Sequence, residues 1–271
     1  MTISLVDYLN QFFSNPALMI TTLLTLLVVF VNGWTDAPNA IATCISTRAM
    51  GPRAAILMAS VFNFLGVFVM TAFNATVAQT IYKMVDFRGD PHDALVALCA
   101  SLFAIVIWAT AAWWFGIPTS ESHALIAGVS GAAIALQGGI DGINMNEWVK
   151  VLYGLVLSTG MGFCMGVLVV KLIEFIFRGF DRRKALGFFK NAQILGGAGM
   201  AFMHGAQDGQ KFMGIFMLSI FLAQGKADVI EFAIPVWLIV LCSAVMALGT
   251  SIGGYRIIKS VGMDMVKLEP Y

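Results

Sequence analysis

Apolar runs long enough to cross a lipid bilayer recur along this chain, and they restrict its fold more than any other feature. The first begins ALMITTLLTLLVVFV, from Ala17 to Val31, and continues in broken form to Thr47. A helix needs about 20 residues to span the hydrocarbon core, and its backbone polar groups must be satisfied within the segment. The runs lack the alternation of a membrane barrel, so we expect an all-α polytopic membrane protein.

Five further runs of this kind follow, at 54–80, 94–115, 149–177, 194–221 and 229–250, the run at 194–221 being interrupted. A shorter apolar segment from Pro118 to Leu136 begins with polar side chains, which predicts a re-entrant or hairpin helix.

Charged residues make up 11% of the chain, against about 25% in a soluble domain. The net charge of +1 gives no reason to expect a nucleic-acid partner, and the four isolated cysteines are interpreted as small apolar residues.

Positive charge is concentrated between Lys171 and Lys190, where six of the sixteen basic residues lie. Short cytoplasmic loops collect Lys and Arg, so this segment is predicted to be cytoplasmic, with FDRRKALGFFK (180–190) as a linker or interfacial helix. If residues 118–136 cross the membrane, the number of crossings before this segment places the N-terminus outside. If they are re-entrant, the number of crossings changes by one and that placement fails. No basic residue precedes the first apolar run, so we expect it to remain in the mature protein.

Two polar motifs interrupt the apolar runs with the same spacing. NGWTDAPNA contains Gly33, Asp36 and Asn39, and HGAQDGQKF contains Gly205, Asp208 and Lys211. A carboxylate at membrane depth costs roughly 2.5–3.5 kcal/mol and usually faces a cavity or an ion path, although one alone could merely lock helices together. Two matched copies favour a functional role. The glycines, with Pro38 in the first copy, predict that both helices unwind here, a pattern that marks the midplane site of a transporter.

A third polar cluster, GIPTSESHALIAG, opens the shorter apolar segment. After Pro118 come hydroxyl side chains, at Thr119, Ser120 and Ser122. This order predicts a helix start, where hydroxyl groups and free backbone N–H groups can bind an anion. Ordinary N-capping is the alternative, and the neighbouring intramembrane acids make it the less favoured one. His123 is interpreted as either a donor to that anion or a packing residue.

GWTDAPNA, PTSESHALIAG and HGAQDGQKFMG resemble the signature segments of the inorganic phosphate transporter family of the PiT type, whose typical forms read like GANDVANA and PVSTTH. The resemblance covers most of the chain, including GGYRIIKSVG near its end. It implies a secondary transporter of two inverted repeats in the bacterial plasma membrane, moving inorganic phosphate by symport with Na⁺ or H⁺ and without a cofactor. The resemblance is also compatible with a homodimer.

The resemblance also implies roles for the motif residues. The cation site would use Asn32, Thr35, Asp36, Asn39, Gln207 and Asp208, and phosphate would meet Thr119, Ser120, Ser122, His123 and Lys211. The chain departs from the family pattern at Thr35 and Gln207, which replace an Asn, at Glu121, which replaces a Thr, and at Lys211, which replaces an Asn. Lys211 either pairs with an Asp or faces the phosphate. Glu121 either carries a coupled proton, because burial favours a neutral carboxyl group, or is an exposed acid at a helix start.

The implied repeats divide the chain into a first repeat at 1–178, a linker at 179–190 and an incomplete second repeat at 191–271. By the spacing of the first repeat, a second Ser/Thr helix start would fall beyond Tyr271. We therefore expect either a C-terminally truncated chain or a half-site supplied by another chain.

Two other functions are compatible with parts of the sequence. A permease of the same fold that carries sulfate or another oxyanion is the nearest alternative. Phosphate is favoured over sulfate because its protonated form can donate a hydrogen bond to a carboxylate such as Asp36. An intramembrane hydrolase using Ser120, Ser122, His123 and the two motif aspartates is the other class. A catalytic triad is defined by a geometry that sequence alone does not show, and the chain has no GxSxG-type motif. A channel is disfavoured because no segment resembles a filter. We expect a transporter and not an enzyme.

Overall fold

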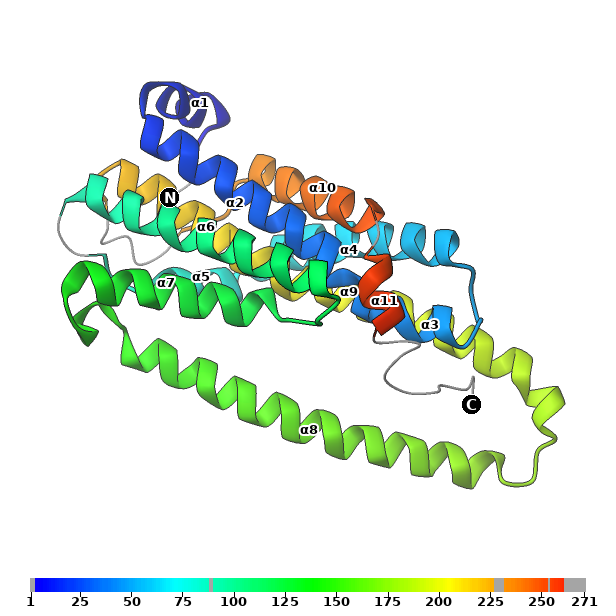
Figure 1. Ribbon diagram of the computed structural model, residues 1–271. Helices are drawn as coiled ribbons and strands as arrows, with labels where there is room; N and C mark the ends of the chain where they lie inside the picture. Colours follow the sequence, from blue (N-terminus) through cyan, green and yellow to red (C-terminus); the bar gives the residue numbers. More distant parts are fainter. Residues whose placement is uncertain (1–2, 88–89, 227–231, 253, 261–271) are drawn as a thin grey trace.

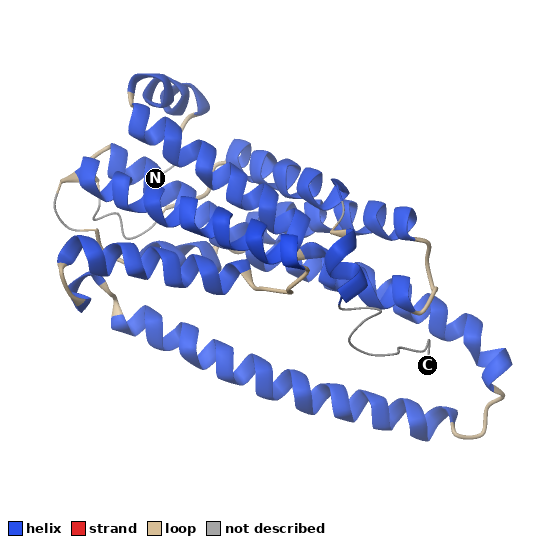
Figure 2. Ribbon diagram, in the orientation of Figure 1, coloured by secondary structure: helices blue, strands red, loops and turns tan. Residues whose placement is uncertain are grey.

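The computed structural model describes residues 3–87, 90–226, 232–252 and 254–260 (Figure 1). These residues form helices joined by short loops, as Figure 2 shows, with one isolated backbone bridge between Val85 and Ile143. The helices are α1 (Leu5–Ser14), α2 (Pro16–Thr35), the 3₁₀ helix η1 (Ala37–Ile41), α3 (Ala42–Ser46), α4 (Pro52–Phe73), α5 (Thr76–Lys83), α6 (Pro91–Phe115), α7 (Glu121–Gln137), the 3₁₀ helix η2 (Ile140–Gly142), α8 (Met145–Phe177), α9 (Arg182–Ala223), α10 (Val236–Ile252) and α11 (Tyr255–Lys259). The predicted all-α fold class is confirmed.

Four stretches of the described chain are long and apolar enough to cross a membrane: Pro16–Ser46, Pro52–Phe73, Pro91–Phe115 and Met145–Phe177. They coincide with the first four predicted runs, which confirms a polytopic membrane protein. α10 falls on the last predicted run but has only 17 residues. α9, with 42 residues, includes the run at 194–221, and residues 182–190 belong to its start and form no separate helix.

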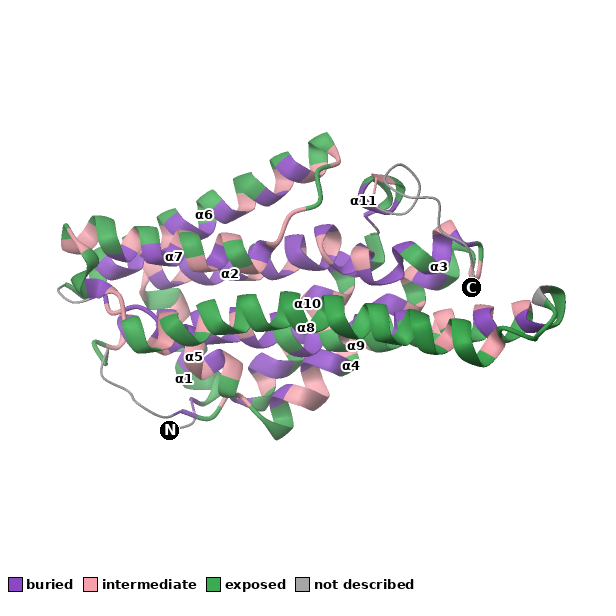
Figure 3. Cartoon of the chain, turned by 90° about the horizontal axis from the view of Figure 1, so that it is seen from below, coloured by how far each residue is buried: buried purple, intermediate pink, exposed green. Residues whose placement is uncertain are grey.

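The helix α9 forms the centre of the bundle. It packs against α4, and α2, α5, α6 and α10 also contact it. Its second half supplies the large, fully buried rings of Phe212, Phe216 and Phe221. α7 turns back beside α6 as a helical hairpin, one of the two forms predicted for this segment (Figure 1). α8 runs along the outside with no buried residue, and Figure 3 shows it almost wholly exposed.

Reciprocal glycines bring α2 and α10 into backbone contact. A Cβ at Gly33 of α2 would lie 2.2 Å from the carbonyl oxygen of Met246 in α10. One at Gly249 of α10 would lie 2.1 Å from the carbonyl oxygen of Phe30 in α2. Real Cβ atoms do not come within 3.0 Å of such atoms, so only glycine allows this approach.

The same arrangement joins α4 to α9. A Cβ at Gly66 of α4 would lie 2.0 Å from the carbonyl oxygen of Phe202 in α9, and one at Gly205 of α9 would lie 2.3 Å from that of Asn63 in α4. Gly33 and Gly205 hold the same position in the two polar motifs. Each motif helix is therefore held against its neighbour in the same way.

The two motifs differ in their backbone conformation. In the first, α2 ends at Thr35 and η1 follows before α3, as the sequence predicted. Pro38 lies in η1 and cannot donate the backbone hydrogen bond of a continuing helix. In the second, α9 continues unbroken through Gly205 and Lys211, so the predicted unwinding there is wrong. This copy has no proline, and each glycine costs a helix only about 1 kcal/mol.

The predicted helix start at Pro118 is displaced along the chain. α6 ends before Gly116, whose φ of 68° is the left-handed conformation that closes many helices. α7 begins only at Glu121, and Ser120 is its N-cap, accepting a hydrogen bond from the backbone N–H of His123. Pro118 therefore lies in the loop between the two helices, and the hydroxyl residues after it are divided between that loop and the first helical turn.

Substituting Gly66 by alanine is expected to destabilise the fold, because the added Cβ would force α4 away from α9. Overpacking of this kind typically costs about 1–3 kcal/mol. Gly162→Ala is the matched control, since a Cβ there on α8 meets nothing within 4 Å. Thermal unfolding in detergent should show a lower midpoint for Gly66→Ala than for the wild type and no decrease for Gly162→Ala. Equal midpoints for the two variants would contradict the packing.

Candidate functional site

The two motifs and the start of α7 meet at one buried cluster of polar side chains, centred on Asp208. This residue lies in the middle of α9 and is 6% exposed. Its Oδ1 accepts hydrogen bonds from Lys211 Nζ at 2.7 Å and from Ser122 Oγ at 3.0 Å. Its Oδ2 accepts one from Asn32 Nδ2 at 3.2 Å. Three helices, α2, α7 and α9, thus supply the donors that satisfy one buried carboxylate.

The acid of the first motif, Asp36, lies beside a second carboxyl group. Asn39 Nδ2 donates to Asp36 Oδ1 at 3.0 Å, and the carboxyl group of Glu121 in α7 lies close to that of Asp36. Glu121 is 1% exposed, and its Oε1 contacts the hydroxyl group of Thr35. Of the two alternatives for Glu121, the exposed acid at a helix start is therefore wrong.

The hydroxyl group of Thr35 has two oxygen atoms within reach and only one hydrogen to donate. It lies 2.8 Å from the carbonyl oxygen of Val31, and it also contacts Glu121 Oε1. When the hydrogen goes to Val31, a hydrogen bond with Glu121 requires a hydrogen on the carboxyl group. Adjacent carboxyl groups also disfavour a second negative charge. The arrangement can accommodate a proton on Glu121.

His204 lies between the two aspartates. Its Nδ1 is 2.9 Å from Asn63 Oδ1, and its Nε2 is 3.9 Å from Asp36 Oδ2 and 3.6 Å from Asp208 Oδ2. Nε2 is buried and has no hydrogen-bond partner among the described residues. One potential ligand atom from His204 and from each aspartate lies within 4.8 Å of the others. This spacing suits a cation shared by the three side chains.

Sequence reasoning did not select His204 or Asn63 as site residues. His204 lies one helical turn before Asp208, and Asn63 is an amide inside an apolar run. Both were detectable signals, because a polar side chain at membrane depth usually meets a polar partner. Thr250 of α10 completes this side of the cluster, its Oγ1 accepting a hydrogen bond from Asn63 Nδ2 at 2.9 Å.

Most of the predicted site residues come together in this cluster, namely Asn32, Thr35, Asp36, Asn39, Glu121, Ser122, Asp208 and Lys211. Lys211 pairs with an aspartate, which was the first of the two alternatives for it. Gln207 is exposed on the surface of α9. Its predicted part in cation binding stays a prediction.

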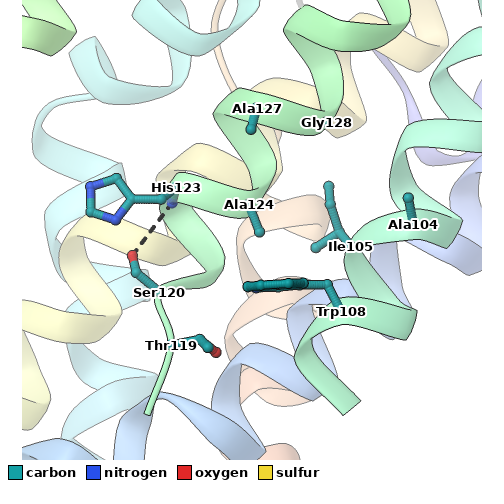
Figure 4. Close-up of a pocket in the computed structure, with 9 residues that line it drawn as sticks. All are labelled: Ala104, Ile105, Trp108, Thr119, Ser120, His123, Ala124, Ala127 and Gly128. Atoms are coloured by element: carbon teal, nitrogen blue, oxygen red, sulfur yellow. Dashed lines mark hydrogen bonds between the residues drawn. The ribbon is translucent and has the colours of Figure 1, made fainter. Parts of the chain in front are cut away.

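Three predicted phosphate ligands line a different hollow, between α6 and α7. Thr119, Ser120 and His123 lie there together with apolar side chains such as Ile105 and Trp108 (Figure 4). The hydroxyl group of Ser120 caps α7, so ordinary N-capping accounts for it in this conformation. His123 is exposed. Contact of these three residues with phosphate stays a prediction.

Comparison with known proteins gives a consistent set of relatives. The model of the phosphate transporter family matches residues 32–186 and 178–271. A protein of Bacillus subtilis (strain 168), named a probable low-affinity inorganic phosphate transporter, is 36% identical over 258 residues, which cover 93% of this chain and 75% of the relative. Proteins of the same name from Rhizobium meliloti (strain 1021) and Mycobacterium leprae (strain TN) are 34% and 32% identical; each match covers 94% of this chain, and 74% and 60% of the relatives.

A solved structure described as the sodium-dependent phosphate transporter has the same fold. Its TM-score is 0.82, with 94% of this chain and 80% of that chain covered. The identity is 22%, so the likeness is one of fold. The matching family is one of transporters, which agrees with the expectation of a membrane protein that is not an enzyme. Because the family model and the relatives match most of the chain, the chain belongs to the phosphate transporter family.

Proposed function

We propose that this chain moves inorganic phosphate across the bacterial plasma membrane by symport with a cation, Na⁺ or H⁺. The observation that carries the proposal is the meeting of Asp36 and Asp208, one from each motif, beside the hydroxyl group of Ser122 at the start of α7. The relatives are named as inorganic phosphate transporters, and the protein of the same fold is described as sodium-dependent. These descriptions support phosphate as the solute and a cation as its companion.

Two places in the cluster suit a coupled cation. One lies between Asp36, His204 and Asp208, where carboxylate oxygens could balance the charge of Na⁺. The other is the carboxyl group of Glu121, which the Thr35 hydroxyl and Asp36 adjoin and which could carry H⁺. The two places are neighbours, so either ion would act on the same pair of motifs.

The coupled cation offsets the cost of removing phosphate from water. An anion loses its hydration when it enters a low-dielectric site, and a nearby positive charge compensates for part of that loss. Ser122 in the first turn of α7 is proposed as a donor to phosphate, with Thr119, Ser120 and His123 as further contacts. Because each ion improves the binding of the other, the two would move together.

Excess sulfate is expected to leave uptake of labelled phosphate largely unchanged. Near neutral pH phosphate is partly protonated and can donate a hydrogen bond to a carboxylate such as Asp36, whereas sulfate has only hydrogen-bond acceptors. Uptake into proteoliposomes would be measured with each anion as competitor, and unlabelled phosphate is the positive control. Competition by sulfate equal to that by phosphate would instead support the alternative, a broader oxyanion permease.

Asp36→Asn and Asp208→Asn are each expected to abolish phosphate uptake, because each removes a charge that would hold or balance the cation. Asp141→Asn is the matched control, since that aspartate is exposed in η2. Labelled-phosphate uptake would be measured in proteoliposomes that contain equal amounts of each protein. Wild-type uptake by either of the first two variants would defeat the assignment.

Glu121→Gln tests the proton place separately from the Na⁺ place. Glutamine keeps the size of the side chain and can still contact Thr35, but it cannot release a proton. We expect the variant to lose the stimulation of uptake by an imposed pH gradient and to keep any stimulation by a Na⁺ gradient. Glu174→Gln, on the exposed surface of α8, should behave as the wild type. Full stimulation of Glu121→Gln by the pH gradient would exclude Glu121 as the proton carrier.

A further inference from the structure

We infer that Lys211 is a tethered cation: its ammonium group fills, beside Asp208, the place that a mobile coupling cation takes beside Asp36. The inference rests on the proposed cation-coupled transport and deepens it, because it assigns one of the two aspartates to a charge that never leaves the protein. This chain would accordingly bind one coupled cation fewer than two identical motifs would bind.

The two motifs make the same hydrogen bond with side chains of different charge. In the first, Asn39 Nδ2 donates to Asp36 Oδ1 at 3.0 Å. In the second, Lys211 Nζ donates to Asp208 Oδ1 at 2.7 Å. Each donor lies three residues after its aspartate, at matching motif positions. The amide is neutral and leaves the charge of Asp36 unbalanced by its partner, whereas the ammonium group neutralises Asp208.

The surroundings of the ammonium group resemble those of a bound metal cation. Lys211 Nζ contacts two oxygen atoms, Asp208 Oδ1 and Ser122 Oγ, each at 2.7 Å. Carboxylate and hydroxyl oxygens are ligands of the kind that hard metal cations take in proteins. The Lys211 side chain is only 19% exposed, so bulk water screens this pair weakly. A Na⁺ ion could use the same two oxygens if the ammonium group were removed.

The balance of charge in the cluster gives the two aspartates different roles. Its acids are Asp36, Glu121 and Asp208, and the ammonium group of Lys211 contacts the last of these. His204 adds a positive charge only when it is protonated. Lys211 is paired to Asp208, whereas the donor that Asp36 receives from its own motif is the neutral amide of Asn39, so the charge of Asp36 remains to be balanced. A mobile cation therefore gains most at Asp36.

Lys211→Asn copies the donor of the first motif into the second and removes the tethered charge. Uptake of labelled phosphate at low Na⁺ should fall by about tenfold or more, because a buried carboxylate is left uncompensated. It should recover as NaCl replaces choline chloride at constant ionic strength, and the Hill coefficient for Na⁺ should rise by about one above the wild-type value. Lys171→Asn is the matched control, since it breaks an exposed Lys–Glu pair of the same spacing on α8.

A second measurement does not depend on transport. Na⁺ that binds the folded protein raises its unfolding temperature. Purified Lys211→Asn in detergent should therefore gain more thermal stability from NaCl, relative to choline chloride, than the wild type or Lys171→Asn gains. An unfolding temperature that responds to Na⁺ as the wild type does, or an unchanged Hill coefficient for uptake, would overturn the inference.

Asn39→Lys is the reciprocal variant, and it decides the matter if Lys211→Asn does not fold. A lysine at this position should hold Asp36 as Lys211 holds Asp208, and stabilisation by Na⁺ should be lost. A variant that keeps a wild-type thermal response to Na⁺ would overturn the inference.

Failure of the proposed function looks different: the wild-type chain would take up no phosphate under a Na⁺ or a pH gradient, while the thermal measurements would still report on Lys211.

Discussion

The desolvation of one carboxylate group constrains the arrangement of the helices around it. Asp208 lies in the middle of α9 and is buried, and an unpaired charge there would be strongly destabilising. Its donors come from α2, from α7 and from its own helix. If one of these helices shifted by a turn, the acid would lose a partner that water could not replace. A single side chain thereby fixes the relative positions of segments that are distant in the sequence.

Close backbone packing is what brings those donors within reach. Asn32, which donates to Asp208, directly precedes Gly33, the residue that allows α2 to approach α10. His204 directly precedes Gly205, which has the same role between α9 and α4. A larger residue at either glycine would displace the helix that carries the neighbouring polar side chain. Packing and polar chemistry are therefore set by adjacent residues in both motifs.

Local sequence patterns predicted the helical membrane fold and the acids of the site, because apolar length and motif spacing are properties of single segments. They failed where a neighbouring helix decides the outcome. Glycine can unwind a helix or let another helix approach, and at Gly205 the contact with α4 determines which occurs. The later start of α7 likewise directs Ser122 to Asp208 and leaves Ser120 as a cap. His204 was missed because its partner Asn63 belongs to a separate run.

The unequal backbones of the two motifs have a mechanical consequence. α9 is one unbroken helix of 42 residues, and its continuous hydrogen bonds resist bending at Asp208. The first motif instead contains the short 3₁₀ helix η1 between α2 and α3. The hydrogen bonds of a 3₁₀ helix have poorer geometry than those of an α-helix, and such a stretch can mark a hinge. A movement that opens the acids toward one side of the membrane would then pivot at residues 36–41, with α9 as the rigid axis about which the other helices turn.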